Sequence, residues 1–584
     1  MPGLIGGPVG ERKLREMAER TYRRDVHETD LLPDVGLGVV HHGDKDPQGS
    51  NVIETENAVG VVYGLTPAPD DGWVESVLHR PQDVLPTFDG PFFIACADRS
   101  TDRYVIATDK MGSRTAYFMN DGTFAFGSEL KSLLPLLPDP TLDARAVCDL
   151  VLMAHVWGSK TLVEEIQSLP PATVATYDDG DLSIDPYWDY TFESAPEQGY
   201  VDSVASAYES VIGELADTVD GRLGIWLSGG LDSRTMAVAL HRRRDDFHTL
   251  TYNRPLERES SPFKSDIDLA KDVSAVLGVN NTSIHMTATK LADRLEEVVE
   301  MTDGMVGWHT LTNLAAIFDI DPATIDVVLE GAAATILCGE KVPVESLRGD
   351  RAPEAELYRL NERVDRDVVR SVLAPDVSPK RTFVEAVQRS DQTTPAAQIL
   401  GATNRNYYRG KHFMSDKISR GFFGTRQPYS NGQLLDEIAR MPPRYRRRML
   451  PFTREKIPHV PSLMKLELAR RFDDGSEQIR YQGTQLRPSR PHWMHGLGFV
   501  VTTAYERLFL PRTITTWYES NDQFRALFDT SLDRAAELPV FDSAGVDRLR
   551  EEHFRGTQDH FEALASISTV DLFVQTVLDG RSGG

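Results

Sequence analysis

The sequence predicts an α/β protein of two domains, a β-rich N-terminal domain followed by a parallel sheet covered by helices. Three observations carry this prediction. The chain has 584 residues, more than one hydrophobic core usually serves. Its first part is a series of short apolar runs between turns, and its second half alternates short strands with helices. Because 40% of residues are hydrophobic and 26% charged, most of the chain should fold.

Six short apolar or alternating runs predict the strands of the first domain. They cover residues 35–41, 58–65, 91–97, 103–108, 115–119 and 123–126. Turn residues such as Asp89-Gly90 separate them, as hairpins in a layered sheet require. Apolar spacing then predicts helices over 129–136 and 144–157, and residues 169–188 add a hairpin. The polar stretch 193–199 separates the predicted domains, 1–192 and 200–584.

The second half alternates strands and helices at the rhythm of a parallel sheet covered on both faces. The predicted strands are 223–227, 248–252 and 326–329, and the first two helices are 233–244 and 265–277. The remaining C-terminal third is predicted to be mostly helical. Its last segment, 560–578, has the pattern of one amphipathic docking helix.

Charge and cysteine content exclude several classes of protein. The net charge of −25 is spread along the chain, which disfavours nucleic-acid binding. Few lysines beside many arginines and acids favour a salt-adapted (halophilic) protein, with an ordinary acidic cytosolic enzyme as the alternative. The three cysteines form neither a zinc motif nor a disulfide framework. Without a signal-peptide pattern or an apolar run of membrane length, we expect a soluble cytoplasmic protein that binds no membrane.

One loop carries the strongest chemical signal. The apolar run 224–227 leads into Ser228-Gly-Gly-Leu-Asp-Ser233, and a helical stretch follows at 234–240. A strand, a glycine turn and a helix N-terminus together form an anion site, because backbone N–H groups and the helix dipole favour phosphate oxygens. Asp232 would repel a phosphate unless a divalent cation lay between them, so magnesium is implied. The alternative is a tight turn with an aspartate cap.

This hexad resembles the PP-loop of N-type ATP pyrophosphatases, which cleave ATP between the α and β phosphates and transfer AMP to a carboxylate. Four further stretches resemble motifs of the asparagine synthetase family, in the family's order: 88–98, 107–117, 124–133 and 161–188. The resemblance covers roughly residues 1 to 450.

The resemblance implies a fold, a cofactor set and site residues. Residues 1–192 would form an Ntn-hydrolase-like αββα sandwich of the glutamine amidotransferase type, and residues 200–584 a PP-loop domain with a helical C-terminal extension. ATP and Mg²⁺ would bind the second domain, with Asp232 as a catalytic residue and metal ligand. The implied ATP-binding residues are Leu227, Ser228, Gly229, Gly230, Leu231, Asp232, Ser233, Tyr252 and Gly331.

The chain departs from the family pattern in the first domain. The family places its nucleophilic cysteine after the initiator methionine, where this sequence has Pro2, with neither a thiol nor a primary amine. Only Asp89 matches a glutamine-binding position of the family. We therefore expect no glutaminase activity and interpret this domain as structural.

A second departure affects the predicted metal site. Ala332 and Thr335 replace a glutamate and a metal-binding aspartate of the family's pyrophosphate loop, which leaves Asp232 as the one clear magnesium anchor. The family also uses a lysine to stabilise charge on the reacting phosphorus. Lys456 is the nearest lysine in the corresponding region, 444–456, although that region is equally well explained as a solvated basic helix end.

Three weaker signals have structural alternatives. Asp266 matches a family position after the second strand, or it is a carboxylate interacting with a helix dipole. Residues 426–429 resemble a packing element near the active cleft. The His41-His42 pair has no metal-ligand partner at a recognisable spacing and is predicted to be a surface pair.

These observations lead to two functional hypotheses. The first is a ligase that adenylates a carboxylate, with aspartate and ammonia as the implied substrates and another acid or amine as an alternative. The second is a homologue that binds ATP or a partner protein without turnover. A third, weaker idea is glutamine hydrolysis through an unrecognised nucleophile. A homodimer is compatible with the resemblance.

Overall fold

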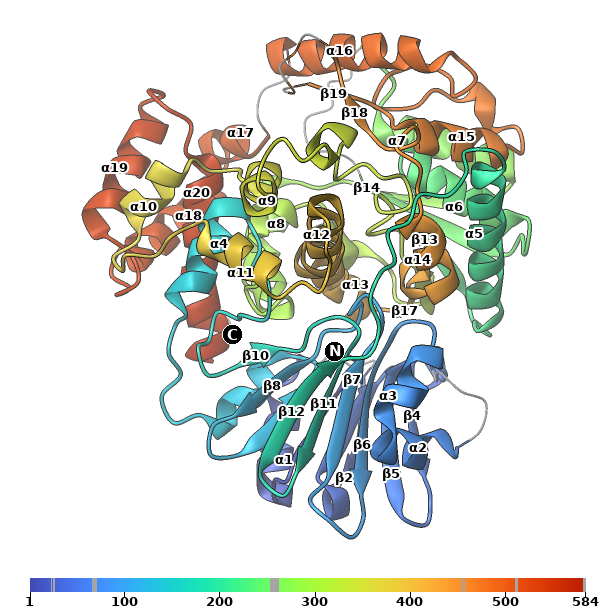
Figure 1. Ribbon diagram of the computed structural model, residues 1–584. Helices are drawn as coiled ribbons and strands as arrows, with labels where there is room; N and C mark the ends of the chain where they lie inside the picture. Colours follow the sequence, from blue (N-terminus) through green and yellow to red (C-terminus); the bar gives the residue numbers. More distant parts are fainter. Residues whose placement is uncertain are drawn as a thin grey trace.

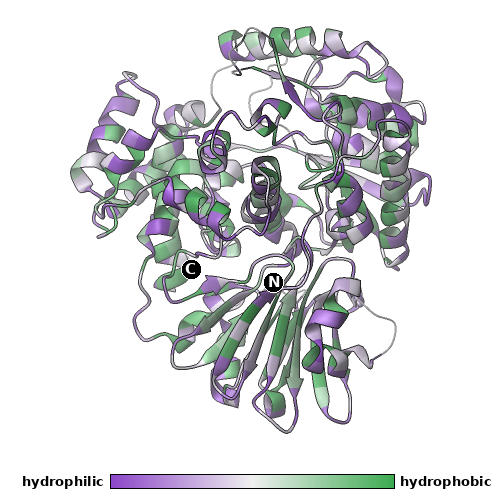
Figure 2. Ribbon diagram, viewed as in Figure 1, coloured by the Kyte–Doolittle hydropathy of each residue, from purple (hydrophilic) through white to green (hydrophobic). Residues whose placement is uncertain are grey.

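Alternating apolar residues build two antiparallel sheets in the N-terminal part of the chain. In β6 (Phe92–Asp98) the side chains of Phe93 and Ala95 belong to the core between the sheets, whereas Ile94 and Cys96 face the other way. This follows from the two-residue period of a strand, because both faces of the sheet are covered here. In Figure 2 hydrophobic residues gather along these strands.

Each of the two sheets has six strands. In spatial order the first contains β10 (Gln167–Ser168), β8 (Tyr117–Asn120), β9 (Phe124–Gly127), β1 (Gly3–Gly6), β3 (Leu37–His41) and β2 (Glu28–Leu32). The second contains β12 (Asp181–Pro186), β11 (Thr173–Asp178), β7 (Tyr104–Thr108), β6, β5 (Ala58–Gly64) and β4 (Ser50–Glu54). All the strand pairs within these sheets are antiparallel.

Helices cover both outer faces of this sandwich. On the second sheet lie α2 (Trp73–His79) and α3 (Pro81–Val84), and α1 (Glu11–Glu19) packs on the first. The αββα layers predicted from the sequence are therefore confirmed (Figure 1). The 3₁₀ helix η4 (Leu130–Leu136) replaces the predicted α-helix over 129–136, and it contains Pro135, which lacks the N–H of a continuous α-helix.

The second part of the chain contains a five-stranded parallel sheet. Its order is β15 (Asn280–Ile284), β14 (Phe247–Tyr252), β13 (Leu223–Trp226), β16 (Val327–Leu329) and β17 (Gly424–Arg426). On one face pack α5 (Tyr200–Asp217), α6 (Leu231–His241) and α7 (Asp266–Leu277), and on the other α8 (Ala288–Met301). The predicted parallel sheet covered on both faces is confirmed.

Helices make up most of the remaining chain. They are α4 (Ala144–Met153), α9 (Pro353–Asn361), α10 (Arg366–Val372), α11 (Arg381–Gln388), α12 (Pro395–Ala402), the π-helix η8 (Thr403–Phe413), α13 (Lys417–Arg420), α14 (Gly432–Ala439), α15 (Leu463–Arg471), α16 (His492–Phe509), α17 (Thr513–Ser520), α18 (Asp522–Ala535), α19 (Ser543–Phe554) and α20 (Phe561–Phe573). Figure 1 shows α16 at the end of the molecule farthest from the sandwich.

The computed structural model describes residues 1–22, 24, 27–65, 71–252, 262–451, 453, 455, 457–509 and 513–580. Two predictions about surface elements are wrong. The segment 560–578 is not amphipathic, because α20 is apolar on all sides and lies buried against α4, α8 and α18. Its length and composition would suit a membrane span, but 72% of the window Phe561–Leu578 is buried inside the protein. His42 is buried and its Nε2 lies 3.0 Å from the Arg420 carbonyl oxygen, so the histidines are not a surface pair.

Candidate functional site

The predicted PP-loop connects β13 to α6 in the centre of the parallel sheet. The Leu227 N–H donates to the Leu250 carbonyl of the neighbouring strand at 2.8 Å, and α6 begins four residues later with Gly230 as its N-cap. No side chain caps this helix at Gly230. The N-terminus of α6 therefore has the geometry expected of an anion site, because the first N–H groups of a helix have no acceptor within the helix and lie at the positive end of its dipole.

Two serine hydroxyls fix the shape of the loop. The Ser228 N–H donates to Ser233 Oγ at 3.0 Å, and the two hydroxyl oxygens lie 2.9 Å apart. The Gly230 N–H donates to Ser228 Oγ at 3.2 Å. These bonds close the loop on itself, so its backbone is held in place before any ligand binds.

Gly229 is held from both sides and has no room for a side chain. Its N–H donates to Asp266 Oδ1 at 2.8 Å, and its carbonyl accepts from the Gln482 N–H at 3.0 Å. A Cβ built at this position would lie 2.9 Å from Leu269 Cβ. Asp266 therefore supports the loop from the first turn of α7, while the capping box of that helix is formed by Ser265 and Asp268.

Asp232 points to a buried lysine that the sequence did not single out. Lys465 Nζ lies 2.7 Å from Asp232 Oδ2 and 2.6 Å from Glu340 Oε2. Burial alone would lower the pKa of this lysine, but the two carboxylates outweigh burial and hold its pKa well above the ordinary value. Lys465 therefore remains charged and offsets part of the negative charge of the two acids.

Cys338 completes this group. Its thiol donates to Asp232 Oδ1 at 3.4 Å. Burial raises the pKa of the Cys338 thiol well above its ordinary value, and the charge of Asp232 adds to this effect. The sulfur is therefore a protonated donor to Asp232 rather than a thiolate nucleophile.

The N-terminus of α15 places Lys465 beside the loop. Ser462 is the N-cap, and its Oγ accepts from the Lys465 N–H at 3.2 Å while donating to the Cys338 carbonyl at 2.7 Å. The Ser462 N–H donates to Glu340 Oε1 at 3.2 Å. One serine thus joins α15 to residues 338–340. The sequence contains one signal for this contact, a serine that can cap a helix three residues before the lysine. Such a serine is common at helix N-termini, so it does not identify Lys465 as a site residue.

The donor set suits magnesium that is partly coordinated by phosphates and water. Asp232 and Glu340 supply two carboxylates within hydrogen-bond distance of the same nitrogen. Among the described residues, no group of three or more His, Cys, Asp or Glu side chains could hold a metal ion. Because Mg²⁺ usually takes one or two carboxylates and fills its other positions with phosphate oxygens and waters, these residues fit it.

The altered pyrophosphate loop packs against α6. Gly331 follows β16, and a Cβ built there would lie 3.2 Å from Met236 Cε. The backbone then turns through Thr335, whose carbonyl accepts from the Glu340 N–H at 3.1 Å. Positions 332 and 335 carry no carboxylate, and Glu340 supplies one at the end of this turn.

The other predicted site residues lie in different surroundings. The ring of Tyr252, at the end of β14, lies 5.6 Å from that of Trp226. Lys456 lies outside the described residues. Asp89 lies at the contact with the second domain, where its Oδ1 accepts from Lys110 Nζ at 2.5 Å and from the Gly432 N–H at 2.9 Å.

Two arginines occupy the space around Pro2. The cavity there has a volume of about 10 Å³, and its walls include His42, Asp46, Arg114 and Arg420. The guanidinium of Arg114 donates to the Thr425 carbonyl at 2.8 Å, and that of Arg420 donates to the Phe413 carbonyl at 2.5 Å. A space of this size holds about one water molecule, so an amino acid does not fit.

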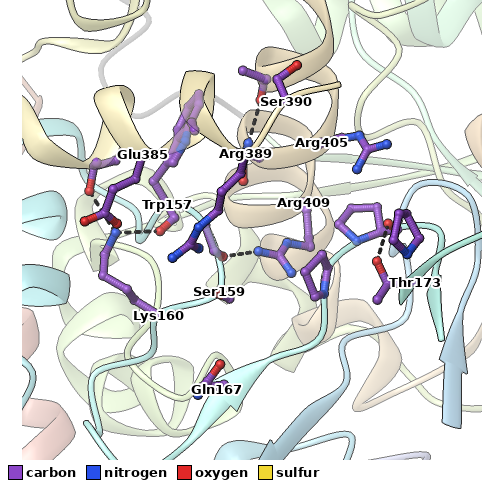
Figure 3. A pocket seen from close by; sticks show the side chains of 18 of the residues that line it. Trp157, Ser159, Lys160, Gln167, Thr173, Glu385, Arg389, Ser390, Arg405 and Arg409 are labelled. Atoms are coloured by element: carbon purple, nitrogen blue, oxygen red, sulfur yellow. Dashed lines mark hydrogen bonds between the residues drawn. The ribbon is translucent and has the colours of Figure 1, made fainter. Parts of the chain in front are cut away.

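A larger cavity of about 600 Å³ lies between the two domains (Figure 3). Its walls come from residues 157–173 of the first domain and from α11, α12 and η8 of the second. Arg409 of η8 reaches across to the carbonyls of Gly158 and Leu169, and Lys160 donates to Thr382 at 2.7 Å. No residue of the PP-loop lines this cavity, so it is separate from the site around Asp232.

Comparison with known proteins follows the same division of the chain. A family model described as a glutamine amidotransferase domain matches residues 74–188, and one described as asparagine synthase matches residues 210–458. Asparagine synthetase [glutamine-hydrolyzing] 1 of Bacillus subtilis (strain 168) is 28% identical over 253 residues. That match covers 42% of this chain and 37% of the relative, so the chain spans little more than a third of the relative's length.

Two solved structures share partial likeness to the chain. One is described as the allosteric regulatory enzyme of purine biosynthesis, with 10% identity, a TM-score of 0.22 and coverage of 50% of this chain and 77% of that one. The other is glutamine phosphoribosylpyrophosphate amidotransferase from B. subtilis complexed with ADP and GMP, with 9% identity, a TM-score of 0.21 and coverage of 57% and 75%. Neither likeness is close enough to add to the sequence matches. The two domain matches and the curated relative support the asparagine synthetase family that the sequence motifs indicate.

Proposed function

We propose that this protein is an ATP-dependent carbon–nitrogen ligase that forms an amide from a carboxylic acid and ammonia or an amine. The observation that carries the proposal is the group formed by Asp232, Glu340 and Lys465 at the N-terminus of α6. Two carboxylates and an ammonium group beside an anion-binding loop are suited to a reaction at a phosphate group.

The loop would hold ATP through its backbone. The N–H groups at the start of α6 would donate to phosphate oxygens, and Ser228 and Ser233 would keep the loop in its present shape. Asp232 and Glu340 would hold Mg²⁺, whose charge neutralises the leaving pyrophosphate.

The chemistry would proceed in two displacements. An oxygen of the substrate carboxylate attacks the α-phosphorus, the bond to the β-phosphate oxygen breaks, and pyrophosphate leaves. The nitrogen nucleophile then attacks the carbonyl carbon of the acyl-adenylate, AMP leaves, and the nitrogen loses a proton. Lys465 would stabilise negative charge in the first step without giving up its own proton, because the neighbouring carboxylates keep its pKa high.

The nitrogen would come from free ammonia or an amine rather than from glutamine hydrolysed by this chain. Pro2 lacks a nucleophile, and the cavity beside it is too small for glutamine. A glutaminase assay tests this point, and glutamate released by the purified protein would contradict it. Resemblance to the family makes aspartate the first candidate for the acid substrate. The product would then be asparagine, and we expect its synthesis to take place in the cytoplasm.

Pyrophosphate exchange into ATP is the direct test of the ligase. We expect exchange that depends on one or more carboxylic acids, with aspartate first in the panel. Asp232→Ala should abolish exchange, because it removes a carboxylate from the proposed metal site. No exchange with any acid, despite measurable ATP binding, would favour a second candidate, an ATP- or partner-binding homologue. Ala332 and Thr335 are the observation that favours this alternative.

A further inference from the structure

Another cavity adjoins the segment whose backbone contacts the PP-loop. It has a volume of about 550 Å³, within the size range of small-molecule sites. Residues 480–487 form much of its wall, and the Gln482 N–H in this segment donates to the Gly229 carbonyl of the loop. The cavity and the PP-loop therefore share one short stretch of backbone.

The charge of this cavity is opposite to that of the protein. Arg480, Arg487 and Arg490 line it, and among the lining residues that the structure describes there is no aspartate or glutamate. The whole chain has 88 acidic residues against 63 lysines and arginines. Three arginines without an acid among the lining residues are therefore not explained by composition.

The guanidinium groups of these arginines are available to a ligand. Within the described part of the chain, none of the three makes an ion pair, although most other arginines around the PP-loop domain do. All three residues are exposed. The contacts that fix them are made by backbone, since Arg234 donates to the Arg480 carbonyl at 2.9 Å and Arg470 donates to the Arg490 carbonyl at 2.8 Å.

The rest of the wall is polar on one side and apolar on the other. Thr484 and Gln485 provide hydroxyl and amide groups, and Gln485 is fixed by a bond from the Lys264 N–H to its Oε1 at 3.2 Å. Phe263, Leu486 and Val501 provide the apolar side. Planar guanidinium groups match carboxylates in two-point contacts, and three of them suit a ligand with more than one anionic group.

We propose that this arginine pocket binds the non-reacting carboxylates of the acid substrate, which is therefore a polyanion such as a short acidic peptide or a tricarboxylic acid. The inference rests on the proposed function, in which the second substrate is a carboxylic acid. Phosphate is a less fitting occupant, because the N-terminus of α6 already offers a phosphate site beside Gly229, which residue 482 contacts.

Calorimetric binding of triaspartate and of tricarballylate tests the pocket without requiring turnover. We expect wild-type protein to bind at least one of them, and R480Q/R487Q/R490Q to bind about tenfold more weakly or worse, since three charge contacts are lost. Binding should weaken with added salt. The matched control is R12Q/R15Q/R444Q, which removes the same charge from exposed arginines elsewhere and should bind like wild type.

The possible outcomes distinguish a failure of the pocket proposal from a failure of the proposed ligase function. Binding of triaspartate alone identifies a peptide substrate, and binding of tricarballylate alone identifies a small acid. Three results would overturn the pocket: neither compound binds, the triple variant binds as well as wild type, or inorganic pyrophosphate displaces the bound acid. Exchange supported by aspartate but by neither polyacid would overturn the substrate class. Exchange that is blank with every acid would instead defeat the ligase itself.

Discussion

At the scale of single residues, one lysine decides the electrostatics of the candidate site. Lys465 lies between Asp232 and Glu340, and its charge allows two acids to lie beside a loop built for anions. Without that charge the two carboxylates would repel both each other and a bound phosphate. The residue that offsets the negative charge of the site therefore comes from α15, more than two hundred residues along the chain from the loop.

Lys465→Met should lower pyrophosphate exchange by about 10²-fold or more, because a group that stabilises developing charge is removed. ATP binding should fall much less, since the loop N–H groups remain. Exchange and ATP affinity are measured side by side, with Lys271→Met as a control at an exposed position. Exchange within twofold of wild type would contradict the role of Lys465.

Buried acids between the domains predict a second effect at this scale, on stability. Burial raises the pKa of Asp416 to about 7, despite the opposing charges of Arg420 and Arg114. Burial also raises the pKa of Glu330, and the nearby Asp416 raises it further. The folded protein therefore binds protons that the unfolded chain releases near pH 4.

The free energy of unfolding should consequently decrease, through Asp416, as the pH rises from about 4 to about 7. Above that range the contribution is constant, and below pH 4 it is fully present. Asp416→Asn removes this titration, so wild type should lose stability relative to the variant across the window. Urea unfolding at several pH values measures the difference. Parallel curves for the two proteins would contradict the prediction, and Asp121→Asn is the exposed control.

At the scale of elements, the junction between β13 and α6 depends on its close neighbours. Gly229 lies between Asp266 of α7 and Gln482 of the C-terminal segment, and both hydrogen-bond its backbone. The loop is therefore set by two other parts of the chain as well as by its own glycines. A side chain at position 229 would push α7 away from the loop.

Gly229→Ala should destabilise the protein by about 1–3 kcal/mol, the usual cost of overpacking. ATP affinity should fall as well, because the displaced backbone carries the N–H donors. Chemical denaturation and ATP titration measure the two effects. Gly10→Ala is the matched control, since a Cβ there meets nothing within 4 Å and its φ of −70° suits alanine. Equal stability of the two variants would contradict the prediction, because it would mean that α7 can shift away from position 229 without a loss of folding free energy.

At the scale of the whole molecule, the two domains are joined through buried charge. Arg426 at the end of β17 donates to both carboxylate oxygens of Asp46, at 2.7 and 3.0 Å, and both side chains are buried. Arg114 of the first domain also donates to the Thr425 carbonyl of β17. The space beside Pro2 is thereby filled by contacts that hold the sandwich to the parallel sheet.

Asp46→Ala should destabilise the protein by about 3–5 kcal/mol, because it leaves Arg426 buried without its carboxylate. Glu197→Ala breaks the exposed pair with Arg444 and should cost no more than about 1 kcal/mol. Urea unfolding of both variants, followed by far-UV circular dichroism, gives the comparison. Similar losses for the two would mean that the buried pair does not hold the domains together.

The sequence by itself determined the two sheet architectures and the position of the PP-loop. These features follow from local periodicity and from residues adjacent in the chain, which a single sequence displays directly. The sequence patterns missed the short strands β1, β2, β4, β15 and β17. They also wrongly predicted an amphipathic helix over 560–578, because burial on every side depends on which other elements pack against a segment.

Only the tertiary structure decided which side chains compensate the charge of Asp232. Glu340 and Lys465 reach Asp232 from distant segments, so no spacing in the sequence connects them. The same holds for Arg480, Arg487 and Arg490, which lie far apart from the PP-loop in the sequence and line one cavity in the fold. Charge compensation acts through space over a few ångströms, and the fold alone determines which side chains come that close.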